Sequence, residues 1–212
     1  MGRPTDISLR SPWAVWAEND IVLIAMAGSH QIWILIDEAQ LGVFAGNGQE
    51  ALVDGSRGEA SFNQPSDISA GFGHLFIADA EASAIRAISL GEEATVMTLV
   101  GQGLFEYGDI DGKGGEVRLQ HPTGLTFHDG LVYVADSYNH KIKTLDPTTG
   151  SVQTLIGTGA VGCHDGSFTE ATLFEPEGVI ARGNTLFIAD TNNHLIRMAH
   201  LSEQRVTTIN IG

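Results

Sequence analysis

The sequence has few cysteines and few basic residues, and each shortage excludes a class of protein. One cysteine, Cys163, in 212 residues leaves no intramolecular disulfide framework, so the fold must be stable without one. Eleven Lys and Arg against 26 Asp and Glu give a net charge of -15, which repels nucleic acids and anionic membranes. The longest apolar run, Ile21 to Ala27, is too short to cross a bilayer, and Met1 to Asp6 has no signal-peptide core. A cytoplasmic protein with neither kind of partner is predicted.

Proline is also scarce, whereas glycine is abundant. The chain has 6 Pro and 26 Gly, where average usage would give about 15 Gly. This balance indicates many tight turns between ordered segments. The length fits one domain over residues 1–212, which is large enough to bury a sizeable core.

A repeat organises the whole chain. Four prolines are spaced by 53, 57 and 54 residues, namely Pro12, Pro65, Pro122 and Pro176. Each is followed by an apolar run that ends in Ala, and each copy then has an isoleucine at the same register: Ile32, Ile85, Ile142 and Ile196. The copies cover approximately residues 7–46, 60–101, 117–157 and 171–212.

Each copy predicts four short strands, because β-rich runs alternate with turn residues and the 3.6-residue period of a helix is absent. In the third copy the strands are expected over residues 124–127, 131–135, 141–146 and 152–156. Such a sheet is apolar on both faces and cannot bury them alone. Radial stacking on similar sheets solves this problem, so an all-β propeller of four four-stranded blades is predicted.

Two segments resemble the NHL-repeat family of β-propellers. In the third copy His121-Pro122-Thr123-Gly124 is followed by Val134-Ala135-Asp136-Ser137-Tyr138-Asn139-His140-Lys141-Ile142, and the fourth copy has the corresponding residues 175–178 and 188–196. The second copy lacks the Asn-His pair, and the first has Met26 in place of the Asp. The long Gly-rich spacers resemble the propeller part of thioredoxin-linked NHL proteins.

The resemblance implies about six blades, so four copies leave three alternatives. The chain forms a closed small ring, or an open arc completed by a second chain, or it is an excerpt of a larger propeller. Gly212 is expected to be the first glycine of a further spacer. An open arc leaves two apolar blade faces, which favour a homo-oligomer of paired arcs.

The aspartates that recur in the repeat are predicted to have structural roles. Asp79, Asp136 and Asp190 each follow a second strand, where a carboxylate accepts N–H groups of its own turn. Three further aspartates precede glycines in the spacers, where they are expected to stabilise turns: Asp54, Asp111 and Asp165.

Two clusters are candidate metal sites, although no cofactor is certain. Three histidines share one repeat position and have the composition of a zinc site: His30, His140 and His194. Three acids within six residues supply hard oxygens for calcium: Glu106, Asp109 and Asp111. Both sets also fit ordinary structural roles. The neighbouring Cys163 and His164 are a weak nucleophile pair, because adjacent loop residues rarely have the required geometry.

The innermost strand of each blade should line the axial channel. The residues expected at the channel mouth follow the four prolines and form a candidate ligand-binding group: Trp13, Ser66, Asp67, Thr123 and Glu177. Two carboxylates there can bind a cation or perform acid–base chemistry, or they can simply solvate a channel.

Two functions therefore remain open. The first is a rigid recognition module that binds a protein or small cationic ligand through its connecting-loop face. The second is a divalent-metal-dependent hydrolase or lyase at the channel mouth, because propellers similar to this family include lyases and calcium-dependent lactonases. No catalytic residue is assigned, and a purely structural fragment is a third reading.

Overall fold

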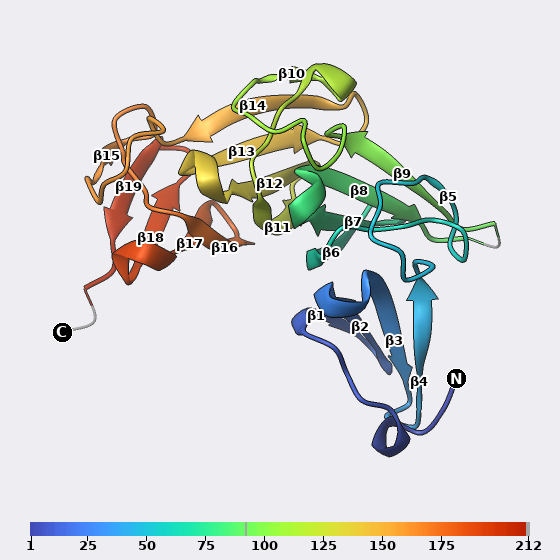
Figure 1. Cartoon of the computed structure of the whole chain (residues 1–212). Coiled ribbons are helices and arrows are strands. Elements are labelled where there is room, and N and C mark those ends of the chain that lie inside the picture. The colour runs from blue at the N-terminus through green and yellow to red at the C-terminus, as the bar shows by residue number, and fades with distance from the viewer. Residues whose placement is uncertain (92, 211–212) are drawn as a thin grey trace.

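The computed structural model describes residues 1–91 and 93–210, and it consists of four antiparallel sheets arranged as the blades of a β-propeller. Figure 1 shows the blades following one another around an open arc, with blade 1 and blade 4 at its ends. Residues 211 and 212, which include the predicted spacer glycine Gly212, lie outside the described residues. None of the described helices is long and apolar enough to cross a membrane.

Each blade is a meander of four strands. Blade 1 contains β1 (Pro12–Glu18), β2 (Ile21–Met26), β3 (Gln31–Ile36) and β4 (Gln40–Ala45). Blade 2 contains β6 (Pro65–Gly71), β7 (His74–Asp79), β8 (Ala84–Ser89) and β9 (Thr95–Val100). Blade 3 contains β11 (Pro122–His128), β12 (Leu131–Asp136), β13 (Lys141–Asp146) and β14 (Ser151–Ile156). Blade 4 contains β16 (Pro176–Arg182), β17 (Thr185–Asp190), β18 (Leu195–His200) and β19 (Arg205–Thr208).

Short elements complete this frame. Three two-residue strands from the spacers add a fifth strand to blades 2, 3 and 4: β5 (Gly55–Ser56), β10 (Gly112–Lys113) and β15 (Gly166–Ser167). One 3-10 turn joins the second and third strands of each blade: η2 (Ala27–Ser29), η3 (Ala80–Ala82), η5 (Ser137–Asn139) and η6 (Thr191–Asn193). Two others are η1 (Pro4–Asp6) and η4 (Gly114–Glu116). The four strands predicted for the third copy are confirmed.

The core lies between the blades. Three apolar clusters fill the three gaps between consecutive sheets, and each takes side chains from both neighbours. The repeated isoleucine is fully buried in blades 1, 2 and 3, but Ile196 of blade 4 is 37% exposed because no blade follows it. On the other end face, Val15 of β1 is 67% exposed, whereas its equivalents Ile68, Leu125 and Val179 are buried. These exposed end faces exclude the closed small ring, whereas an arc completed by a second chain and an excerpt of a larger propeller both leave such faces open.

Buried ion pairs connect the strands of blades 2 to 4, and they correct the predicted roles of the repeated aspartates. In blade 2, Asp79 does not cap its own turn. Its Oδ1 accepts the N–H of Asn63 at 2.6 Å, and its Oδ2 accepts from Arg86 at 3.0 Å. Arg86 also donates to Asp54 of the spacer at 2.9 Å, so Asp54 joins the spacer to β8 instead of stabilising only a turn.

The same arrangement recurs in the next two blades with a cation seven residues after the aspartate. Lys143 lies between Asp136 and Asp111, and Arg197 lies between Asp190 and Asp165. The side chains of all three cations, Arg86 included, are completely buried. Burial raises the pKa of Asp79 and Asp136 to about 6, although the cation beside each opposes this rise.

Blade 1 lacks both members of this pair. Met26 replaces the aspartate and Trp33 replaces the cation, and both join an apolar cluster on the outer face of the blade with Ile24 and Leu41. The N-terminal segment covers part of this face, because Ile7 packs on the cluster and Gly2 pairs with Leu41. Loss of the charge and loss of its partner therefore occur together.

Candidate functional site

The residues predicted at the channel mouth mainly join neighbouring innermost strands. Ser66 Oγ donates to the carbonyl of Pro122 at 3.4 Å, and Thr123 Oγ1 donates to the carbonyl of Glu177 at 3.1 Å. Asp67 Oδ2 accepts the N–H of Leu125 at 2.8 Å, and its Oδ1 accepts that of Ile68. These bonds fix the order of β6, β11 and β16 around the axis.

Burial raises the pKa of Asp67 to about 6, against the lowering effect of its two backbone hydrogen bonds. In the part of the chain that the structure describes, the side chains of the other two predicted residues form no such link between strands. Glu177 is exposed on β16, and Trp13 is 54% exposed on β1, at the open end of the arc. A ligand at the channel mouth stays a prediction.

Neither candidate metal cluster forms a metal site in the described residues. In the described part of the chain, no three His, Cys, Asp or Glu residues are grouped so that they could hold a metal ion. His30 and His140 end their 3-10 turns in the left-handed conformation, and the Nδ1 of each accepts an N–H from the next blade. His194 occupies the same position at the exposed end of η6. These positions explain the histidine repeat structurally.

The acidic cluster is neutralised by cations. Asp109 binds Lys141 and Lys143, whose hydrogen bonds outweigh the effect of burial and lower its pKa. Asp111 binds Lys143 and the N–H of Thr154, with the same result for its pKa. Glu106 forms an ion pair with Arg118 at 3.3 Å. Cys163 is exposed, while the backbone of its neighbour His164 bonds to Thr172 and Arg197.

An exposed aromatic surface lies on the connecting-loop face of blades 2 and 3. We call it the loop-face patch, and it consists of Leu104, Phe105, Tyr107, His121 and Tyr138. Phe105 is 87% exposed, Tyr107 57% and Tyr138 49%, which is unusual for side chains of this size. The rings of His121 and Tyr138 stack with centroids 4.5 Å apart and 14° between their planes. Every member of the patch except Phe105 lines a hollow of about 220 Å³, together with Ala80, Glu81, Ser83 and Gln120.

Backbone and side-chain hydrogen bonds hold the patch in place. Tyr138 N donates to the carbonyl of Gln120 at 3.2 Å, and His121 N donates to Ser83 Oγ at 3.3 Å, so the segment before β11 is tied both to η5 and to the residue that follows η3. In the spacer, Asn139 Nδ2 donates to the carbonyl of Gly108 at 2.7 Å, and Arg118 contacts Gln102 and Glu106. The exposed rings therefore stand on an anchored loop.

None of the site residues predicted from the sequence lies in this patch, although the spacers differ in length. From its first glycine to the Asp-Gly pair, the second spacer covers 101–112, two residues more than 46–55 or 157–166. The extra residues lie between the Gly-x-Gly start and the Asp-Gly end of this spacer, in the segment that contains Leu104, Phe105 and Tyr107. An aromatic insertion in one copy of a repeat was the available signal.

Comparisons with known proteins agree with the propeller. The NHL repeat profile matches residues 119–145. The chain is 48% identical over 208 residues to Protein SUPPRESSOR OF QUENCHING 1, chloroplastic, of Arabidopsis thaliana, which covers 92% of this chain and 20% of that protein. It is 40% identical over 235 residues to NHL repeat-containing protein 2 of Homo sapiens, covering 98% of this chain and 32% of that protein. The chain thus spans a fifth to a third of the length of these relatives.

Solved structures resemble it in fold alone. An auxiliary nutrient binding protein from Bacteroides ovatus superposes with a TM-score of 0.67 at 15% identity, covering 95% of this chain and 47% of that one. Virginiamycin B lyase from Staphylococcus aureus superposes with a TM-score of 0.61 at 12% identity, covering 95% and 56%.

Proposed function

Because the chain belongs to the NHL-repeat family of β-propellers, we propose that it is a recognition module that binds a partner protein through the loop-face patch. The observation that supports this most is the exposure of Phe105, Tyr107 and Tyr138 on one anchored surface. Aromatic side chains are enriched in the centres of protein interfaces, where they supply most of the binding energy. A rigid scaffold also reduces the entropy lost on binding.

The charge of the chain defines the partner. The net charge is -15, and Glu81 borders the hollow of the patch beside His121. A partner segment that carries apolar side chains next to Lys or Arg matches this surface in both respects, and its association should be favoured at low salt.

A peptide-display library tests the proposal with a defined probe. Peptides selected on the wild-type chain are expected to combine apolar and basic residues and to bind more weakly as salt increases. Phe105→Ser combined with Tyr138→Ser should weaken their binding at least about tenfold. The matched control is Phe72→Ser, which removes a phenylalanine that is 62% exposed outside the patch. Selected peptides that bind the double variant as well as the wild type would refute the proposal.

We also propose that a second copy of the chain covers the two end faces of the arc. The open face of blade 4 carries Ile196 and Ile180, at positions that pack on a following blade elsewhere in the chain. The open face of blade 1 carries Val15 and Leu9, which is 43% exposed while its equivalents in the other copies are buried. Blade 1 of one copy therefore matches the face that blade 4 of another copy presents.

Light scattering at micromolar concentration tests this pairing. The wild type should have the mass of two chains, and Ile196→Asp should give single chains, because a buried unpaired carboxylate disfavours the contact. Ile110→Asp, at a residue that is 52% exposed away from the end faces, should leave the mass unchanged. A wild-type mass of one chain would contradict the pairing.

A cytoplasmic location stays a prediction from the sequence.

A further inference from the structure

Blades 2 and 3 depart from the repeat at one end, and the departures line a single cavity or support the side chains that line it. Five positions are involved: Gly71, Phe72, His74 and Ala87 of blade 2, and Phe127 of blade 3. This cavity lies at the β6–β7 turn and the β13–β14 turn, whereas the η turns and the loop-face patch lie at the opposite end of the blades.

The other copies of the repeat have different chemistry at all five positions. At the position of Gly71 the other copies have charged or polar side chains, namely Glu18, His128 and Arg182. At the position of Phe72 they have residues that favour turns, namely Asn19, Asp129 and Gly183. His74 replaces Ile21, Leu131 and Thr185, and Ala87 replaces Ile34, Thr144 and Met198. Phe127 stands where the other three copies have alanine, namely Ala17, Ala70 and Ala181.

Phe72 is an unfavourable residue for its place in the fold. It has a φ of 50°, in the left-handed region, and it is 62% exposed. The two-residue turn that joins β6 to β7 favours Asn, Asp or Gly at this position, as in the other blades. The side chain of Phe72 therefore contributes something other than turn stability, and its ring forms one wall of the cavity.

Gly71 and Phe127 depend on each other. A Cβ atom at position 71 would lie 2.1 Å from Cδ1 of Phe127, so only glycine admits this ring. Phe127 in turn contacts Phe72 edge to face, with centroids 4.9 Å apart, and stacks on Phe76 at 5.5 Å. The pair thus supports two of the aromatic rings that line the cavity.

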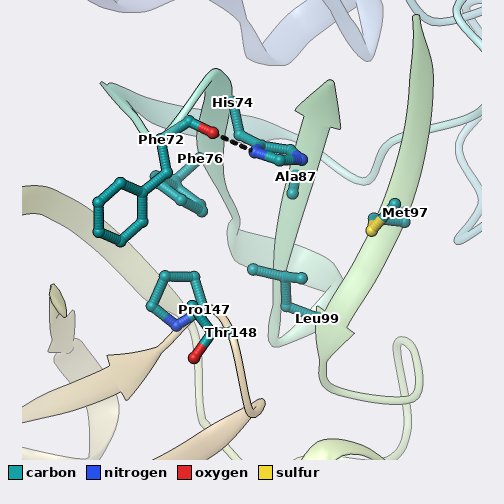
Figure 2. Close-up of a pocket in the computed structure, with 8 residues that line it drawn as sticks. All are labelled: Phe72, His74, Phe76, Ala87, Met97, Leu99, Pro147 and Thr148. Atoms are coloured by element: carbon teal, nitrogen blue, oxygen red, sulfur yellow. Dashed lines mark hydrogen bonds between the residues drawn. The ribbon is translucent and has the colours of Figure 1, made fainter. Parts of the chain in front are cut away.

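The small side chain of Ala87 helps to open the space between these rings and the neighbouring blade. Figure 2 shows Phe72 and Phe76 on one side, Met97 and Leu99 on the other, and Pro147 of blade 3 facing them. The cavity has a volume of about 180 Å³. Apolar cavities of about 150 Å³ bind benzene, so one aromatic ring fits.

His74 provides a directional polar group. Its Nδ1 lies 2.9 Å from the carbonyl oxygen of Phe72, and the dashed line in Figure 2 marks this hydrogen bond. Because that carbonyl can only accept, Nδ1 carries the proton in the neutral ring, and Nε2 is the acceptor. We propose that the cavity binds a small monocyclic aromatic molecule that carries a hydrogen-bond donor, with the ring beside Phe72 and Phe76 and the donor on His74 Nε2.

Phenol and toluene are the probes, since they differ in the donor and have similar shape. Chemical shifts of the Met97 methyl group are expected to change on phenol addition and to saturate, with a dissociation constant on the order of 1 mM or tighter. Toluene should bind about tenfold more weakly than phenol, because the acceptor of His74 stays unpaired. His74→Phe should remove this preference.

Two variants separate the cavity from general effects. Ala87→Ile restores the residue of the first repeat and should abolish phenol binding, while Thr144→Ala at the same repeat position of blade 3 should not change it. Phe72→Asn is expected to fold at least as stably as the wild type and to weaken phenol binding about tenfold. Shifts that do not saturate, or undiminished binding by a folded Phe72→Asn variant, would overturn the proposal.

Discussion

Removal of Arg86 should destabilise the chain strongly, because its guanidinium is the partner of a buried carboxylate. Arg86 donates to Asp79 and Asp54 and to the carbonyls of Val53 and Ser61, all at 2.9 to 3.0 Å. Arg86→Met leaves Asp79 buried without its cation. Breaking such a pair by removing one partner costs about 3–5 kcal/mol of the free energy of unfolding. Urea unfolding followed by circular dichroism at pH 7 measures it.

The double variant Arg86→Met with Asp79→Asn is the control, because it removes the buried charge and keeps an acceptor for Asn63. It should lose about 1–3 kcal/mol, which is less than the single variant loses. The single variant should also recover stability in acid. The pKa of Asp79 is already raised to about 6 in the folded wild type and should rise further without Arg86, so the folded state takes up a proton before the unfolded state does.

Two results would refute this reasoning. One is a loss below about 1 kcal/mol for Arg86→Met, since a median exposed ion pair accounts for that much. The other is a double variant that is less stable than the single one. Blade 1 supports the expectation, because Met26 and Trp33 replace the acid and the cation together.

Three further changes have definite expected outcomes. Gly71→Ala should lower the free energy of unfolding by about 1–3 kcal/mol, because the new Cβ overpacks against Phe127. Gly73→Ala is the control for turn strain, because its φ is 71° and no atom lies within 4 Å of the new Cβ. Phe72→Asn should raise the free energy of unfolding by about 1 kcal/mol, because asparagine tolerates the left-handed φ of 50° better than phenylalanine. An unchanged Tm would contradict backbone strain at this residue. The pKa of Asp67 is about 6 in the folded chain against an ordinary value of 3.8, so its contribution to the free energy of unfolding is greatest below about pH 4 and is lost as pH rises through 6. Asp67→Asn should therefore reduce the change in the free energy of unfolding between these two pH values by about 3 kcal/mol. Parallel pH profiles of the wild type and the variant would exclude this role of Asp67.

The strands could be predicted because the repeat fixes their register four times. The residues of blade 3 between Pro122 and Ile156 contain four β-rich runs separated by turn residues, and each run is a strand in the structure. A single copy would have been ambiguous, but one apolar position recurring at constant register excludes chance alternation. The same repeat counts four blades, and this number made open faces on blades 1 and 4 one of the expected alternatives.

The roles of the conspicuous polar residues were harder to predict. The carboxylate of Asp79 looked like a turn cap because a turn follows it, yet its partners are Asn63, sixteen residues earlier, and Arg86 on the next strand. Sequence did contain the signal, since a cation stands seven residues after each of the three aspartates. The contact of Gly71 with Phe127 has no such signal, because it forms between blades and depends on their spacing.

A repeat chain provides its own comparison, and this makes its departures informative. Where two departures compensate each other, as Met26 with Trp33 or Gly71 with Phe127, the change preserves packing and needs no function. Phe72 and Phe105 are different, because both rings are exposed: Phe72 stands where the other copies have Asn, Asp or Gly, and Phe105 lies in the one lengthened spacer. Exposure of an apolar ring is unfavourable in water and neither ring is needed to close a blade, so selection for a bound partner is the physical reason left to keep them. The two rings stand at opposite ends of the blades, which separates the patch for a protein from the cavity for a small molecule.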